Sequence, residues 1–334
     1  MKSQSNNPFH AWVRLEQSRL GSSVVYATDE FFAAKERLIE PQDPVFIEDK
    51  YDDHGKWMDG WESRRKRTEG YDYCIVRLGI PGIVHGFDID TSYFTGNYPP
   101  AASIDACMSE AELPDDNADW RELLAAVDLQ GDAHHFLAAE NDQPCTHLRL
   151  NIYPDGGVAR LRVYGEVRPD WNKVGKNEVI DLFAIENGGR AILCSDQHYG
   201  SKHNLNFADR GVDMGDGWET ARRRTPGNDW VILRLGHPGH IEKVEIDTAH
   251  FKGNYPDRAE LRAALITDDS DLESSSAQWP VLLPASKLDM DMQHLFTDAL
   301  QKVGAVSHVR LNIFPDGGIS RVRLYGKIAG TDTS

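Results

Sequence analysis

A short segment in the second half of the chain, SDQHYGSKH (195–203), carries side chains suited to acid–base chemistry. It supplies one carboxylate, Asp196, one amine, Lys202, and two imidazoles, His198 and His203. Imidazole changes its charge close to neutral pH, so histidine is the side chain that enzymes use most often to transfer protons. We therefore predict that Asp196, His198 and His203 take part in proton transfer. The alternative is a pair of ordinary surface histidines.

A second segment, DGWETARRR (216–224), combines a carboxylate with a basic cluster. The chain as a whole is acidic, with 53 Asp and Glu residues, 36 Lys and Arg residues and a net charge of −17. A guanidinium group binds a carboxylate through two parallel hydrogen bonds. Arg222 is predicted to bind an anionic ligand and Glu219 to act beside it. The alternative is that these arginines pair with acids on the protein surface.

The first half of the chain contains a counterpart of the histidine segment. In TDEFFAAKERL (28–38), Phe31 and Glu36 occupy the places of the two histidines. Because the first half is built on the same pattern without them, His198 and His203 are not required by the architecture. We therefore predict that the site lies in the second half.

Further residues are predicted to contact the ligand. Arg65 of the segment DGWESRRKR aligns with Arg222, and Lys202 adds a second positive charge. A GNYP turn follows a strand in each half, and in the second half it supplies Asn254 and Tyr255. Glycine, asparagine and proline favour a sharp turn, which is the simpler interpretation of GNYP. The polar groups of Asn254 and Tyr255 are nevertheless candidates for ligand binding.

These segments belong to a repeat that runs through the whole chain of 334 residues. HLRLNIYPDGGVARLRVYG (147–165) and HVRLNIFPDGGISRVRLYG (308–326) are identical at 13 of 19 positions. Each copy is the size of a domain, roughly 150 residues, whereas solenoid repeats are much shorter. We predict one domain at residues 15–167, a second at 181–328, and a linker at 168–180.

The repeated segments have the alternation of β-strands. In HLRLNIYP and ARLRVYG, every second residue is apolar, which is typical of a strand with one face on a core. The PDGG between them predicts a hairpin turn that pairs the two strands. ADWRELLAAV (118–127) looks helical, but its partner AQWPVLLPAS (277–286) has Pro284 where a helix would break, so we expect both to be extended or irregular. The pattern predicts an all-β fold of sandwiches or barrels.

Composition and motifs limit the function. The negative charge argues against nucleic acid or an anionic membrane as a partner, and no apolar run is long enough to span a membrane. The four cysteines lack metal-ligand spacing and are expected to be free thiols in a reducing compartment. The N-terminus has no secretory signal, so a cytoplasmic location is expected. His147 and His308 are interpreted as structural. His134 and His294 are expected to occupy equivalent positions in the two halves, and both a structural and a functional role remain open for them.

The combination of SDQHYGSKHNL, DGWETARRR, IDTAHFKGNYP and HVRLNIFPDGGISRVRLYG, with its copy in the first half, resembles the allantoicase family. The four motifs occur in a fixed order, each of them twice. The resemblance implies two tandem jelly-roll β-sandwiches similar to galactose-binding domains. It also implies hydrolysis of allantoate to ureidoglycolate and urea in purine breakdown, and a homo-oligomer. We expect no cofactor and no metal ligand set.

The chemistry of allantoate suggests a role for each candidate. Proton transfer and polarisation are assigned to His198, His203, Asp196 and Glu219, since urea leaves readily only when its nitrogen is protonated. Binding of the substrate carboxylate and ureido groups is assigned to Arg222, Lys202, Asn254, Tyr255 and Arg65. Two other functions remain open from the sequence: a non-catalytic module that binds a sugar or a small polar ligand, and a hydrolase of a related ureido compound.

Overall fold

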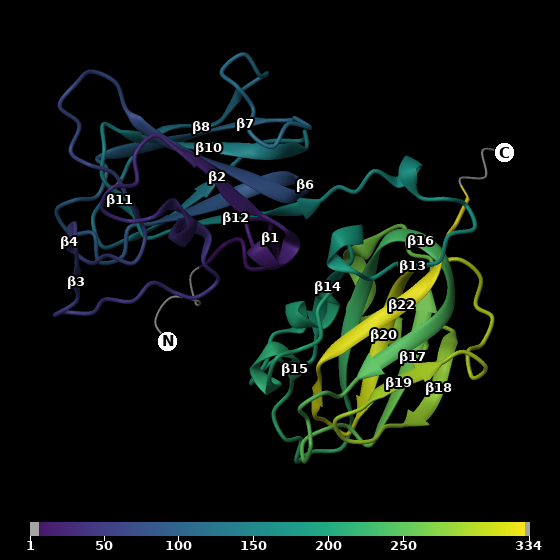
Figure 1. Cartoon of the computed structure of the whole chain (residues 1–334). Helices are drawn as coiled ribbons and strands as arrows, with labels where there is room; N and C mark the ends of the chain where they lie inside the picture. Colours follow the sequence, from purple (N-terminus) through teal and green to yellow (C-terminus); the bar gives the residue numbers. More distant parts are fainter. Residues whose placement is uncertain (1–6, 331–334) are drawn as a thin grey trace. The chain divides into compact units, whose positions relative to one another are not determined.

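The computed structural model describes residues 7–330, in which the chain divides into two compact units between Arg168 and Pro169. Each unit is a β-sandwich whose strands are joined by loops and short 3-10 turns (Figure 1). The architecture confirms the prediction of an all-β fold with two tandem jelly-roll sandwiches. None of the helices in the described residues is long and apolar enough to cross a membrane.

The two units contain the same order of main strands. The first unit has β1 (Val13–Arg14), β2 (Ser23–Ala27), β3 (Tyr51–Asp52), β4 (Gly55–Lys56), β5 (Trp61–Glu62), β6 (Asp72–Asp90), β7 (Ala101–Cys107), β8 (Arg121–Asp128), β9 (His134–Ala138), β10 (Cys145–Tyr153), β11 (Gly157–Val158) and β12 (Arg160–Val167). The second has β13 (Ile180–Asp181), β14 (Arg190–Cys194), β15 (Trp218–Glu219), β16 (Asp229–Asp247), β17 (Arg258–Ala264), β18 (Val281–Lys287), β19 (Gln293–Phe296), β20 (Val306–Phe314), β21 (Gly318–Ile319) and β22 (Arg321–Ile328). Within residues 7–330, the small hairpin β3–β4 has no counterpart in the second unit.

One long strand connects the two layers of each sandwich. In the first unit, the N-terminal part of β6 pairs with β10 and β2, and its C-terminal part pairs with β12 and β9. Strand β16 is shared in the same way between β20 and β14 on one side and β22 and β19 on the other. The strand therefore passes from one layer to the other, and the apolar core lies between its two parts.

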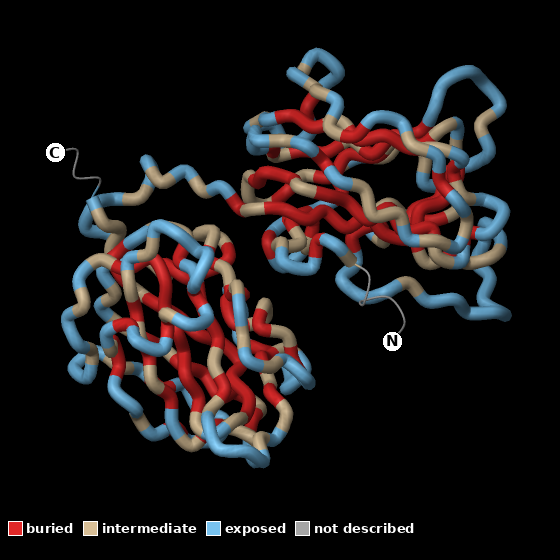
Figure 2. The backbone as a smooth tube through the Cα atoms, turned by 180° about the vertical axis from the view of Figure 1, so that it is seen from behind, coloured by how far each residue is buried: buried red, intermediate tan, exposed pale blue. Residues whose placement is uncertain are grey.

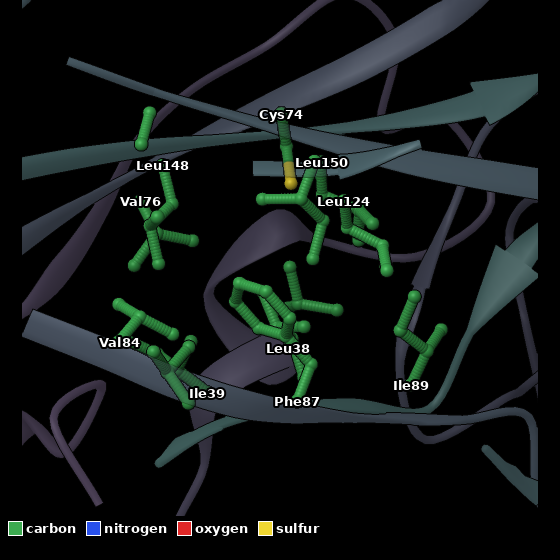
Figure 3. Close-up of a cluster of buried hydrophobic side chains, with 14 of the residues drawn as sticks. Leu38, Ile39, Cys74, Val76, Val84, Phe87, Ile89, Leu124, Leu148 and Leu150 are labelled. Atoms are coloured by element: carbon green, nitrogen blue, oxygen red, sulfur yellow. The ribbon is translucent and has the colours of Figure 1, made fainter. Parts of the chain in front are cut away.

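The core of the first unit shows this arrangement directly. Val76 and Cys74 of one layer face Val84 and Phe87 of the other, and Leu38 fills the space between them (Figure 3). Burial of each large apolar side chain contributes about 1.5–3 kcal/mol to stability. In both units the buried backbone follows the strands, and the loops are exposed (Figure 2).

The predicted PDGG hairpin is wrong. Strands β10 and β12 do not pair with each other, because β6 lies between them in the hydrogen-bonded order. The PDGG segment (154–157) instead carries the chain from one layer to the other. Its last glycine begins β11, which pairs with β5. Alternation of apolar residues shows that a strand buries one face, but it does not show which strand accepts its backbone hydrogen bonds.

The PDGG segment lies against the GNYP turn in each unit. In the second unit Gly318 donates its N–H to the carbonyl of Asn254 at 2.8 Å. A side chain at Gly318 would place its Cβ 2.0 Å from the ring of Phe251, and the preceding Gly317 has a φ of +136°. Only glycine meets both demands without strain. The two turns are thus fixed against each other beside β15.

The segment 118–127, interpreted as extended or irregular, forms most of β8, and its partner segment forms most of β18, which follows a short helix, α1 (Leu272–Ser275). The expected alignment of His134 with His294 is wrong. His135 lies opposite Ile89 as His294 lies opposite Ile246, so these two histidines are the equivalent pair.

His134 instead belongs to an ion pair of the first unit. Its Nδ1 lies 2.8 Å from a carboxylate oxygen of Asp88, and this hydrogen bond raises the pKa of His134 to about 9. The second unit has Gln293 at the same register position, opposite Asp247. His134 is part of the fold and not of the predicted site.

We expect His134→Gln to lower the free energy of unfolding by about 1 kcal/mol at pH 6, since the pair is partly exposed to solvent. Because the pKa of His134 is higher in the folded than in the unfolded protein, the ion pair contributes its full stabilisation below the unfolded pKa near 6.5. This contribution to the free energy of unfolding is lost as pH rises through the folded pKa of about 9. Denaturant titrations of both proteins between pH 6 and pH 10 test this. A difference that stays constant across this range would contradict it.

Candidate functional site

A fully buried tryptophan fixes the segment that carries the predicted site. Trp218 of β15 is 0% exposed, and its indole N–H donates to the carbonyl of Asp196 at 2.8 Å. Trp61 of the first unit donates to the carbonyl of Asp29 at the same distance, 2.8 Å. A buried indole N–H needs an acceptor, so burial of the ring also fixes the loop.

The carboxylate next to this tryptophan is held by the GNYP turn. Asn254 donates a side-chain hydrogen bond to Glu219, and Asn97 donates the equivalent bond to Glu62 at 2.7 Å. The carbonyl of Glu219 also accepts the N–H of Gly200 at 3.2 Å, which joins β15 to the histidine segment. Burial raises the pKa of Glu62 in the first unit.

Asp196 ties the histidine segment to the basic cluster. Its carboxylate accepts the N–H of Ala221 at 2.6 Å, which places exposed Arg222 next in the chain. The first unit has Arg64 in place of Ala221, and the guanidinium of Arg64 pairs with Asp29 at 2.6 Å. Burial alone would raise the pKa of Asp29, but the hydrogen bonds from Arg64 hold it below its ordinary value. Ala221 cannot neutralise Asp196 in this way.

The two equivalent lysines have opposite surroundings. Lys202 begins the 3-10 turn η6 (Lys202–Asn206), is 8% exposed, and has its Nζ 3.4 Å from Nε2 of His203. Burial lowers the pKa of Lys202, and in the described part of the chain no ion pair with an acid is found for it. Lys35 pairs with Glu36 at 2.8 Å and with Glu30 at 3.3 Å, and the hydrogen bond from Glu36 raises its pKa.

The remaining residues of the predicted site have fewer contacts with the hydrogen-bonded groups around Asp196 and Glu219. His198 is exposed, with its ring edge against Tyr199 at a centroid distance of 4.5 Å. Tyr255 packs against the apolar core of the second unit. Arg65 is an exposed residue of the first unit. Hydrogen bonds therefore join Asp196, Glu219, Asn254 and the segment with Arg222 into one frame. The turn with Lys202 and His203 belongs to it through the backbone, since the N–H of Lys202 donates to the side chain of Gln197 at 3.3 Å.

The first unit differs in a further way around the equivalent residues Asp29, Lys35, Glu62 and Asn97, which form its own frame. Phe31, the counterpart of His198, stacks on His54 of the loop between β3 and β4 at a centroid distance of 4.2 Å. Asp52 of β3 contributes to raising the pKa of Glu62, so the hairpin lies near this carboxylate. The second unit has the short 3-10 turn η7 (Met214–Asp216) in the corresponding part of the chain.

No group of three His, Cys, Asp or Glu side chains suited to a metal ion is found in residues 7–330. The frame of the second unit consists instead of carboxylates, a lysine, an arginine and imidazole. This set can bind an anion, accept hydrogen bonds from N–H groups and exchange protons.

The chain matches the family model described as "Allantoicase repeat" twice, at residues 13–168 and 180–329. The chain belongs to the allantoicase family. A "Probable allantoicase" of Pseudomonas fluorescens (strain SBW25) is 56% identical over 324 residues, which are 96% of this chain and 98% of the relative. One from Photobacterium profundum is 57% identical over 95% of this chain and 97% of its own.

A solved structure supports the same relationship. The crystal structure of the allantoicase of Saccharomyces cerevisiae has a TM-score of 0.78 and 37% identity, and covers 94% of this chain and 92% of that chain. The family resemblance inferred from the four repeated motifs is therefore confirmed.

Sequence reasoning missed the pairing of Glu219 with Asn254 and the different partners of the two lysines. The signal for the first was present, because Trp-Glu and Gly-Asn-Tyr-Pro occur together in both halves. The signal for the second was also present: Glu30 and Glu36 are replaced by Gln197 and His203. Only the three-dimensional position of the lysine side chain shows that these two replacements remove the acids that pair with the lysine in the first unit.

We expect Asp196→Ala to lower the free energy of unfolding by about 1–2 kcal/mol, because the N–H of Ala221 loses its acceptor. Arg222→Ala should change it by no more than about 0.5 kcal/mol, since the side chain is exposed. Chemical denaturation of the variants and the wild-type protein measures both effects. Equal losses in the two variants would show that Arg222 is part of the folded frame.

Proposed function

We propose that this protein hydrolyses allantoate to ureidoglycolate and urea, and that the second unit carries the reaction. The activity rests on one observation, the match to allantoicases over 96% of the chain. The alternative of a non-catalytic sugar-binding module is not favoured, since the solved structure matched at a TM-score of 0.78 is an allantoicase.

The placement in the second unit rests on the charges of the two frames. In the first unit Asp29 is neutralised by Arg64, and Lys35 by Glu30 and Glu36. The corresponding positions of the second unit hold Ala221, Gln197 and His203, none of which carries the compensating charge. Charged groups without a compensating charge in the protein remain able to bind a charged, hydrogen-bonding substrate.

Each part of the substrate has a matching group in the second frame. Arg222 is solvent-exposed and binds the carboxylate of allantoate through its guanidinium. Glu219 and Asp196 accept hydrogen bonds from ureido N–H groups. Glu219 has this capacity because a carboxylate offers about four acceptor positions and Asn254 occupies one of them. Asn254 is thus a positioning residue that orients the Glu219 carboxylate.

The reaction itself needs a proton at the leaving nitrogen and the removal of a proton from water. The bond between the central carbon and one ureido nitrogen breaks, and that nitrogen leaves as urea after protonation. Water then adds to the central carbon and loses a proton. His203 and Lys202 are the basic groups joined to this frame, while His198 is placed at its exposed edge.

We also propose that the enzyme is a cytoplasmic homo-oligomer that binds no nucleic acid. All four cysteines are free, three of them buried, as is usual in a reducing compartment. The net charge of −17 disfavours binding to a polyanion. The oligomer is proposed from the family resemblance.

The purified protein should release urea from allantoate, and Glu219→Gln should lower kcat/KM about 10–100-fold. The loss corresponds to one charged hydrogen bond, about 1.5–3 kcal/mol. Glu62→Gln, the matched change in the first unit, should leave kcat/KM unchanged. A urea assay with and without chelator measures the activity, and circular dichroism checks the fold of each variant.

Two outcomes would contradict the proposal separately. Absence of urea under varied pH and metal supply would remove the proposed activity. Loss of activity in Glu62→Gln with an active Glu219→Gln would place the site in the first unit.

A further inference from the structure

The side-chain amide of Asn254 faces two acceptors of unequal strength. Its Nδ2 donates to the carboxylate of Glu219 and also lies 3.8 Å from the sulfur of Met214, within reach of a hydrogen bond to sulfur. A carboxylate is a strong acceptor and a thioether is a weak one. The N–H directed at Met214 is therefore the one that a better acceptor can take.

Met214 is held in this place by the backbone around it. It begins the 3-10 turn η7, and its carbonyl accepts the N–H of Gly217 at 3.2 Å. Asn204 of η6 donates its side-chain amide to the carbonyls of Gly215 at 3.3 Å and Gly217 at 3.1 Å. The turn that carries the thioether is thus tied to the histidine segment and to the start of β15.

The surface around this contact is open. The Met214 side chain is 46% exposed, and Asn254 is half-buried. A Cβ built at Gly253 would meet no atom within 4 Å apart from its neighbours in the chain. A small ligand can therefore reach the amide of Asn254 without a rearrangement of the backbone.

The first unit keeps the bond between amide and carboxylate but lacks the methionine. Asn97 donates to Glu62 at 2.7 Å. Trp57 occupies the position of Met214, two residues before the DGW of its unit. The ammonium of Lys50 lies 3.6 Å from the centroid of the Trp57 ring, so this ring binds a cation. An exposed thioether beside the amide is therefore particular to the second frame.

Asn254 and Glu219 together present a hydrogen-bond donor beside an acceptor. A ureido group has the complementary pattern, because its N–H groups flank a carbonyl oxygen. One ureido N–H donates to the carboxylate of Glu219 while the carbonyl oxygen accepts the second N–H of Asn254. The two side chains thus recognise both kinds of polar atom in a single ureido group.

We infer that Met214 is a positioning residue of the substrate site, whose thioether holds the second N–H of Asn254 and releases it to the carbonyl oxygen of a ureido group. The inference rests on the proposed function and deepens it, because it gives Asn254 a direct contact with the substrate. A weak acceptor suits this role, since it orients the amide in the free enzyme and costs little to replace.

The first experiment turns the thioether into a strong acceptor. Hydrogen peroxide oxidises an exposed methionine to its sulfoxide. The sulfur lone pair forms the bond to oxygen, the O–O bond breaks and water leaves, so sulfur loses the two electrons that the peroxide gains. The sulfoxide of Met214 should keep the N–H of Asn254 from the substrate. KM for allantoate should rise about tenfold, the value of one hydrogen bond, with kcat unchanged.

Two variants serve as controls for this treatment. Met214→Leu should have a KM within about threefold of the wild type, because the volume is kept and only a weak bond is lost, and peroxide should leave its KM unchanged. Met108, in the first unit, is 56% exposed, and Met108→Leu should remain as sensitive to peroxide as the wild type. Peptide mass spectrometry measures the sulfoxide at each methionine. Oxidised Met214 with an unchanged KM, or a sensitive Met214→Leu, would overturn the inference.

The second experiment measures the contact without turnover. Ureidoacetate, which has one ureido group and one carboxylate, should slow the oxidation of Met214 in the wild-type protein several-fold and leave the oxidation of Met108 unchanged. Acetate, which lacks the ureido group, should protect neither methionine. Ureidoacetate that inhibits urea release without protecting Met214 would contradict the proposed contact.

Failure of the inference can be distinguished from failure of the proposed function. A wild-type protein that releases no urea would disprove the activity. An active protein whose KM does not respond to oxidation of Met214 would disprove the role of the thioether alone. If Met214→Leu does not fold, the protection of Met214 relative to Met108 in the wild-type protein still decides the inference.

Discussion

The hydrogen bond from a buried tryptophan to a loop carbonyl is the interaction on which each site frame depends. The indoles of Trp61 and Trp218 are completely buried, so each N–H must find an acceptor inside the protein. The acceptor is the carbonyl of Asp29 or Asp196, and this bond holds the polar loop against the apolar core. Both units meet this constraint in the same way. The backbone of the frame is therefore common to them, and the side chains placed on it are free to differ.

The side chains on the frames of the two units differ mainly in their charge. In the first unit, acids and bases on the frame neutralise one another, as in the pair of Asp29 with Arg64. In the second unit the aspartate and the lysine are retained, but their partners are replaced by Ala221, Gln197 and His203. Buried groups without a compensating charge lower the stability of a protein, and such groups are common where a substrate binds. Duplication allows one unit to keep a frame whose charges are neutralised while the other carries the uncompensated groups that we propose to bind the substrate.

The frame depends on the placement of two strands that are neighbours in the sequence, β10 and β12, in different layers of the sandwich. Strands β10 and β12 carry the most similar repeated sequence, yet both pair with the long β6 and not with each other. The glycines between them are used to lay the PDGG segment against the GNYP turn and to pair β11 with β5. This pairing fixes Glu62, and the equivalent one fixes Glu219, at the edge of the sandwich. A tight hairpin would have left no partner for these short strands.

The sequence by itself determined the duplication, the β-strands and the family, because alternation, turn residues and repeated motifs are local properties that can be read along the chain. It also indicated that His198 and His203 are dispensable for folding. Tertiary structure decided which strands pair, that His135 and not His134 corresponds to His294, and that Glu219 meets Asn254. It also decided that Lys202 lies buried against His203 while Lys35 lies between two acids. These features depend on contacts between distant segments, and burial and the distance to a partner determine the charge state of a side chain more than its residue type does.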